Sequence, residues 1–107
     1  MIAPEPDLSS LSEVDRLVHE PARLVVMASL YVVKSADYTF LMRQAGLTWG
    51  NLSAHLSKLE EAGYIQIEKT YRGKRPYTLV RLSDNGRDVF KNYMVQMKTV
   101  LNNLDAD

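Results

Sequence analysis

Residues 40–67 restrict the fold of this chain more than any other stretch of its sequence. Gly46 suits a helix C-terminus, because glycine adopts the left-handed conformation common there, and Thr48 suits the N-cap of a following helix. Three leucines then recur at spacings of four and three, which places them on one helix face: Leu52, Leu56 and Leu59. After Gly63 the sequence begins to alternate as a strand does. The stretch therefore predicts two helices around a tight bend, a helix-turn-helix whose second helix can enter a DNA major groove.

A family resemblance rests on the same residues. Residues 53–65, SAHLSKLEEAGYI, resemble the S-x-H-L-x-x-L-x-x-A-G-L/Y-V run of ArsR-type winged-helix repressors, and LTWGNL at 47–52 is similar to a one-domain ArsR/MarR-like branch. The run LSDNGR at 82–87 is similar to the L-T/S-x-x-G-R of MarR-like proteins. The resemblance implies a mainly α fold with a small antiparallel β-hairpin (α+β): a winged helix-turn-helix with N- and C-terminal dimerisation helices.

The pattern along the chain predicts a single domain over residues 1–107. Pro21 suits the first turn of a helix that runs to about residue 33, and residues 35–39 are expected to form a connection. Two alternating runs joined by a turn at Gly73 predict a hairpin, which we call the wing. The other expected segments follow from apolar spacing and capping residues: an N-terminal helix over about 9–20, the helix-turn-helix over 38–62, the wing over 64–82 and a C-terminal helix over 83–104, capped by Ser83.

Composition limits the classes of function that the chain can serve. There is no cysteine, which removes disulfides and thiolate metal sites, so the Cys-rich metal sites of many ArsR sensors have no counterpart. The sequence contains no 18-residue apolar run and its acidic N-terminus does not resemble a signal peptide, so we expect a cytoplasmic protein. It has no recognisable nucleophile motif or Gly-rich phosphate loop. We therefore expect a protein that is not an enzyme and needs no metal or cofactor.

Charge is distributed unevenly, although the formal net charge is zero. Residues 1–20 carry five acids and one arginine, whereas residues 64–82 carry five basic residues and one glutamate. The N-terminal part therefore repels phosphate, while the wing attracts it. We predict that the basic residues near its turn contact the DNA backbone or minor groove: Lys69, Arg72, Lys74 and Arg75.

The second helix of the helix-turn-helix supplies the remaining candidate DNA contacts. Small or polar residues lie opposite its leucines and can reach base edges or phosphates: Asn51, Ser53, Ala54, Ser57 and Lys58. Gln44 and Thr48 lie near the helix entry, where free N–H groups meet phosphate. Trp49 is expected to pack between helix and wing, with a contact to a sugar-phosphate strand as the alternative.

The two histidines are expected to have structural roles. His55 lies beside the leucine face, which favours a partly buried, hydrogen-bonded side chain over a metal ligand or DNA contact. His19 has no cysteine and no second histidine near it in the sequence. We interpret it as a helix-end or interface residue.

Two apolar stripes predict a homodimer. One lies near the N-terminus, and the other follows a seam of about two heptads in the last helix: Leu11, Val14, Leu17 and Val18, then Phe90, Met94, Met97, Leu101 and Leu104. Together they exceed what the core of a small winged domain needs. The alternative is that both stripes fold onto the same subunit and leave a monomer.

These observations predict a sequence-specific regulator that binds double-stranded DNA, and the resemblance implies repression. A protein–protein interaction module is one alternative, against which the basic wing argues. Another is a sensor of an unknown small-molecule effector, with Tyr31, Tyr38 and Met94 as candidate lining of a pocket at a dimer interface.

Overall fold

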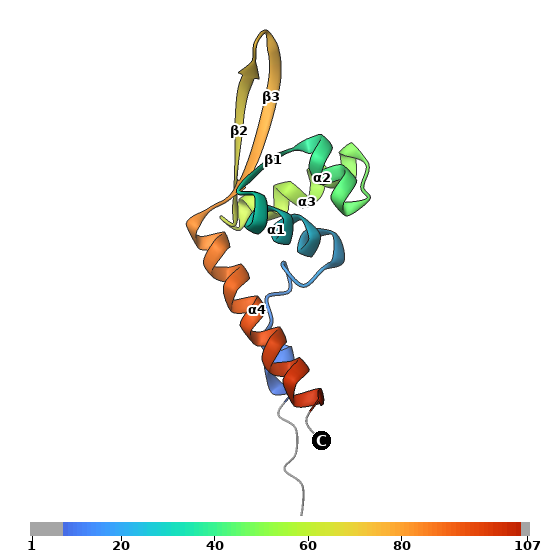
Figure 1. Ribbon diagram of the computed structural model, residues 1–107, viewed down its shortest axis with the longest axis vertical. Helices are drawn as coiled ribbons and strands as arrows, with labels where there is room; N and C mark the ends of the chain where they lie inside the picture. Colours follow the sequence, from blue (N-terminus) through green and yellow to red (C-terminus); the bar gives the residue numbers. More distant parts are fainter. Residues whose placement is uncertain (1–7, 106–107) are drawn as a thin grey trace, which may run out of the picture.

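The computed structural model describes residues 8–105 (Figure 1). Its elements in chain order are η1 (Ser9–Glu13), α1 (Pro21–Val33), β1 (Ser35–Asp37), α2 (Tyr38–Ala45), α3 (Trp49–Glu61), β2 (Ile65–Arg72), β3 (Arg75–Leu82) and α4 (Asp84–Asp105). The strands form an antiparallel sheet in the order β1-β3-β2. The wing projects from one end of the molecule and α4 from the other. None of the helices in the described range is long and apolar enough to cross a membrane.

The helix-turn-helix has the predicted local structure. Gly46 ends α2 in the left-handed conformation with a φ of 65°, and the Thr48 hydroxyl oxygen accepts the N–H of Asn51 at 3.2 Å. The three leucines of α3 are completely buried against α1 and α2, and they fix which face of α3 points outward: Leu52, Leu56 and Leu59. The prediction of two helices around a tight bend is confirmed.

The prediction of a helix over residues 9–20 is wrong beyond its first turn. A 3-10 helix covers Ser9–Glu13, and Val14 is already extended. The Asp15 carboxylate then accepts the N–H groups of Leu17 and Val18 at 2.9 and 3.1 Å, which closes a turn in place of a helix. The proline at the start of α1 also forces an extended conformation on the preceding residue.

A short strand replaces the connection expected over residues 35–39. β1 pairs with β3 through Ser35 to Asp37, so the sheet has three strands where the sequence predicted a hairpin alone. Three residues are too few to show an alternating pattern. The strand forms because β3, far along the chain, offers its free edge.

The start of α4 is held tightly against the end of the helix-turn-helix. The Ser83 hydroxyl accepts the N–H of Gly86 at 2.9 Å, which confirms the predicted cap. The Ser83 N–H donates to the carbonyl oxygen of Tyr64 at 3.0 Å. Tyr64 in turn donates its hydroxyl to Asp15, and burial raises the pKa of this tyrosine to about 12. These contacts join the N-terminal turn, the wing base and α4.

Candidate nucleic-acid interface

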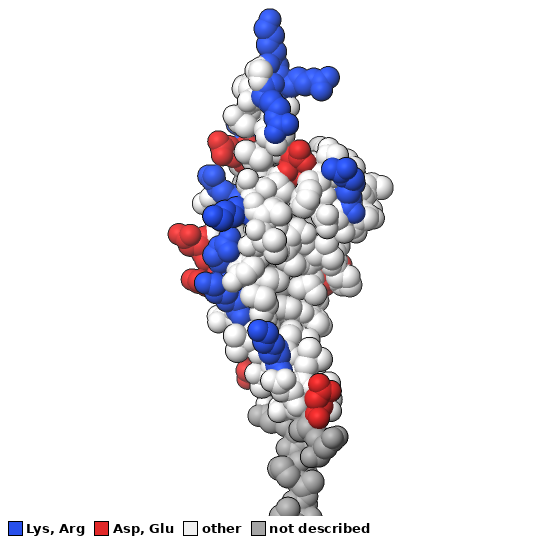
Figure 2. All heavy atoms as spheres, viewed as in Figure 1, with Lys and Arg blue, Asp and Glu red and all other residues white. Residues whose placement is uncertain are grey.

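Basic side chains gather at the exposed end of the wing, with no acidic side chain among them in this view (Figure 2). Its turn contains Gly73 with a φ of 64°. Arg72 is held in place, because its guanidinium lies 4.3 Å from the centre of the Tyr77 ring and donates to the Tyr77 hydroxyl at 3.1 Å. Lys74 and Arg75 are exposed and form no ion pair with any residue from 8 to 105. Their charges are therefore available for a phosphate.

The outward face of α3 consists of short or polar side chains. Most of the residues predicted from the sequence to contact DNA are exposed there, while one is half-buried: Asn51, Ala54, Ser57 and Lys58, then Ser53. Gln44 on α2 and Thr48 at the helix entry are also exposed. The hydroxyl oxygen of Thr48 accepts the cap bond, so this residue positions α3 whatever else it contacts.

Trp49 packs less than the sequence suggested. Its ring lies 6.0 Å from the ring of Tyr38, yet 62% of the residue is exposed, because no side chain of the wing covers it. The indole therefore forms part of the molecular surface at the entry to α3.

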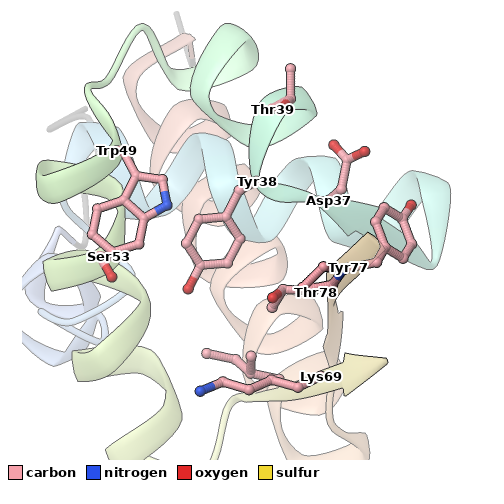
Figure 3. Close-up of a pocket in the computed structure, with 10 residues that line it drawn as sticks. Asp37, Tyr38, Thr39, Trp49, Ser53, Lys69, Tyr77 and Thr78 are labelled. Atoms are coloured by element: carbon pink, nitrogen blue, oxygen red, sulfur yellow. The ribbon is translucent and has the colours of Figure 1, made fainter. Parts of the chain in front are cut away.

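A hollow separates α3 from the wing (Figure 3). It has a volume of about 590 Å³, and its lining comes from β1, α2, α3 and both wing strands, including Asp37, Tyr38, Trp49, Ser53, Lys69 and Thr78. The sequence predicted Ser53 and Lys69 as separate DNA contacts and gave Trp49 such a contact as an alternative to packing, and the structure brings all three to one hollow. The sequence did not predict that Tyr38 belongs to this site, because no local sequence pattern shows that the start of α2 faces the wing.

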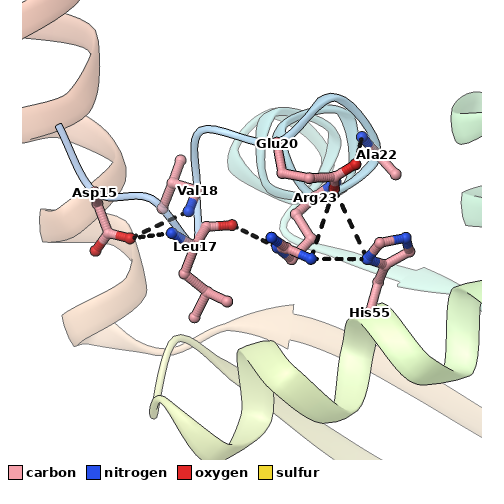
Figure 4. A network of polar contacts seen from close by, with 7 residues as sticks. All are labelled: Asp15, Leu17, Val18, Glu20, Ala22, Arg23 and His55. Atoms are coloured by element: carbon pink, nitrogen blue, oxygen red, sulfur yellow. Dashed lines mark hydrogen bonds and ion pairs between the residues drawn. The ribbon is translucent and has the colours of Figure 1, made fainter. Parts of the chain in front are cut away.

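His55 connects α3 to α1 (Figure 4). Arg23 donates from Nη1 to Nδ1 of His55 at 3.1 Å and from Nε to the Leu17 carbonyl at 2.6 Å. Glu20 caps α1 and lies 3.8 Å from the same His55 nitrogen. The backbone N–H of Arg23 lowers the pKa of the Glu20 carboxyl. The expectation of a half-buried, hydrogen-bonded His55 is confirmed, and this network sets the position of α3.

The other histidine also bonds within the subunit. His19 Nδ1 lies 2.7 Å from the Tyr93 hydroxyl, which ties the N-terminal segment to α4. The part of the chain that the structure describes contains no group of three His, Cys, Asp or Glu residues able to hold a metal.

The two apolar stripes divide between the core of the chain and its surface. Val14, Val18 and Phe90, which the sequence assigned to a dimer interface, are buried in the core of the single chain, and Leu17, Met94 and Met97 are partly buried against them. Three leucines of these stripes are exposed by 40, 54 and 61%: Leu11, Leu101 and Leu104. The apolar surface available to a second subunit therefore includes the free end of α4 and η1.

Comparison with known proteins identifies the family of the chain. Residues 22–101 match the model of the winged helix DNA-binding domain family. The chain belongs to this family. It is 30% identical over 91 residues to the uncharacterized protein MJ0432 of Methanocaldococcus jannaschii, which covers 85% of this chain and 99% of that protein.

Solved winged-helix structures have the same fold. The transcriptional regulator homologue from Pyrococcus horikoshii OT3 superimposes with a TM-score of 0.85 at 29% identity, over 92% of this chain and 99% of the other. A putative MarR-family transcriptional regulator from Enterococcus faecalis V583 gives a TM-score of 0.71 at 17% identity, over 91% and 87% of the two chains. The chain therefore shares the winged-helix fold of both solved proteins, in agreement with its family.

Proposed function

We propose that residues 1–107 act as one winged-helix unit that binds specific double-stranded DNA as a homodimer and represses transcription. Helix α3 enters the major groove, and the wing contacts the flanking backbone or minor groove. The observation that carries this proposal is the combination of a small polar face on α3 with a projecting basic wing beside it. A major groove is wide enough to admit a helix whose outward side chains are short.

The dimer follows from the size of the reading surface. One helix covers only a few base pairs, too few to find a single site in a genome. Two subunits related by a two-fold axis would read half-sites about 34 Å apart, one turn of DNA. The exposed leucines at the free end of α4 supply apolar surface for such an assembly. A stable interface of this kind buries about 1,200–2,000 Å².

The alternative functions have less support. A protein–protein interaction module does not need the charges of Lys74 and Arg75, and salt-sensitive DNA binding would separate the two functions. The candidate lining for an effector pocket is dispersed. Tyr31 packs against Phe90 with ring centres 5.4 Å apart, whereas Tyr38 lies against Trp49 on another side of α1.

Selection of bound fragments from the source genome tests the proposal directly. A regulator of this kind should enrich a common sequence with two-fold symmetry. Enrichment without a shared motif would leave only non-specific binding, and no enrichment would contradict DNA binding itself.

The basic residues of the wing should make the affinity for DNA depend on salt concentration. Each phosphate neutralised by the protein contributes about 0.9 to the slope of log affinity against log salt. Replacing Lys74 and Arg75 together with alanine should therefore lower that slope by up to about 1.8 and weaken binding to all sequences. A matched double replacement of the exposed Lys91 and Lys98 on α4, which points away from the wing, should leave the slope unchanged. Equal slopes for all three proteins would exclude an electrostatic role for the wing.

The outward side chains of α3 are expected to recognise the DNA sequence. Asn51, Ser53 and Ser57 lie opposite the buried leucines and are expected to contact base edges. Alanine at a residue that reads a base should cost about 1–3 kcal/mol for the preferred base and less for other bases at that position. Affinities for a set of single-base operator variants measure this. If each replacement weakens every variant equally, these side chains position α3 and do not read sequence.

A further inference from the structure

One face of the wing packs against the core at its base and extends past the core toward the proposed DNA-binding side of the molecule. Ile65 and Ile67 of β2 pack against the core on this face, opposite Leu82 and Val80 of β3. Side chains two residues apart on a strand share a face, so Lys69 is the next residue on it. Its partner across the sheet is Thr78. The strand pairing therefore directs Lys69 over the entry of α3, into the hollow of about 590 Å³.

The polar side chains that line this hollow come from several elements. Figure 3 shows the hydroxyl of Tyr38 and the amine of Lys69 pointing into the same space, with Ser53 on the α3 side. Lys69 forms no ion pair with any acid between residues 8 and 105. A cation and a hydroxyl donor suit an oxyanion such as a phosphate.

Neither nearby acid forms an ion pair with Lys69. The Asp37 carboxylate accepts the N–H of Phe40 at 2.8 Å, capping α2, and points away from the amine in Figure 3. Glu68 lies on the opposite face of β2, where it pairs with Arg81 at 3.6 Å. The Asp37 carboxylate also lines the hollow, but it is directed away from the part where Lys69 faces α3.

Trp49 gives the hollow a flat, exposed wall. Its indole is 62% exposed and rests against Tyr38, so the broad face of one aromatic side chain borders the polar groups. The volume also lies within the range of about 300–1,000 Å³ typical of ligand pockets, larger than one phosphate group requires. The space suits a phosphate together with the sugar attached to it.

We propose that this hollow holds one phosphodiester of the bound DNA, together with its deoxyribose. Lys69 supplies the counter-charge, Tyr38 donates a hydrogen bond to a phosphate oxygen, and Trp49 covers the adjoining sugar. The inference rests on the proposed function and adds to it a fixed crossing point for one strand between α3 and the wing. That anchor would set the register of α3 on its half-site, because phosphate contacts position a protein along the duplex.

Intrinsic fluorescence reports on the hollow directly, since Trp49 is the only tryptophan in the chain. Binding of a selected duplex to the full chain should change its emission. Lys69→Gln should lower the salt slope by about 0.9, and Tyr38→Phe should weaken binding without changing that slope. Lys91→Gln on α4 serves as the charge-matched control and should have neither effect. Unchanged melting temperatures would show that the variants remain folded.

Neutralising single DNA phosphates identifies the phosphodiester that lies in the hollow. We expect a methylphosphonate at one position in each half-site to weaken binding of the wild-type protein, and to weaken Lys69→Gln little further, because the contact is already lost. The proposal is overturned if wild type and variant lose the same affinity at every position, or if DNA leaves Trp49 emission unchanged. In either case the protein still binds DNA, and the proposed function stands.

Two further outcomes also contradict the proposal. If inorganic phosphate at matched ionic strength changes Trp49 emission and the duplex does not, the hollow binds a free anion and not the DNA backbone. If the wild-type protein binds no duplex at all, the proposed function fails together with the anchor.

Discussion

Replacing Gly86 with alanine should destabilise the fold by about 3 kcal/mol, at the upper end of the typical cost of overpacking a well-packed site. A Cβ at this position would lie 1.9 Å from the carbonyl oxygen of Tyr64 and 2.7 Å from its carbon. These are backbone atoms, and they cannot move without disturbing the hydrogen bond from the Ser83 N–H to the same oxygen. Either α4 shifts away from the base of the wing or its first turn is lost. Urea unfolding measures the loss.

Gly50→Ala provides the matched control for this prediction. Gly50 also lies in a helix, but nothing comes within 4 Å of the position that its Cβ would take. Alanine should therefore stabilise the protein here by about 0.5–1 kcal/mol, the usual advantage over glycine in a helix. Opposite signs for the two variants would confirm that close approach, not loss of glycine in general, causes the effect at residue 86. A similar small change in both would show that α4 is not docked tightly on Tyr64.

Local chemistry explains which parts of the fold the sequence predicted well. The capping bonds of Gly46, Thr48 and Ser83 reach residues within four positions, so these capping roles can be predicted from the neighbouring sequence, although Ser83 also bonds to Tyr64. The leucine spacing of α3 reflects the period of the helix, independent of what covers it. Gly86 differs, because its role depends on the backbone of Tyr64, more than twenty residues away.

Long-range contacts explain the failures. Residues 35–37 become a strand only because β3 pairs with them, and the helix predicted over 9–20 stops because Asp15 bonds to two N–H groups that a helix would need. Apolar spacing in that segment assigned Val14 and Val18 to a dimer interface on a helix, whereas the structure buries both in the core of the chain outside any helix. In that segment the apolar character of the residues predicted their burial, whereas their spacing predicted the wrong secondary structure.

The candidate DNA site was predicted as a set of residues but not as an arrangement. Charge density identified the wing, and residue size identified the outer face of α3. The hollow between them depends on where the start of α2 lies relative to β2, and this brings Tyr38 and Lys69 together. The link from Arg23 to His55 likewise joins segments more than thirty residues apart, and no local pattern indicates it.

Replacing both Leu101 and Leu104 with glutamate should convert the proposed dimer into a monomer. The two leucines are 54 and 61% exposed near the free end of α4, where two-fold symmetry would bring both copies of each together. Four carboxylates would then share one interface and repel each other. Because simultaneous binding of two half-sites raises affinity by about 10²–10⁴, operator affinity should fall by a factor of that order while single half-site affinity is retained.

Light scattering separates the outcomes, since the chain mass is 12.2 kDa. The wild-type protein should have twice this mass and the double variant the mass of a single chain. The helical circular dichroism signal of the variant should be unchanged. Val32→Glu is the control: Val32 is 78% exposed on α1, away from the free end of α4, and the same change of chemistry there should preserve the dimer. A wild-type mass of 12.2 kDa at micromolar concentration would contradict the dimer, and each subunit would then bind its half-site alone. Dissociation by Val32→Glu but not by the leucine replacements would instead place the interface on α1.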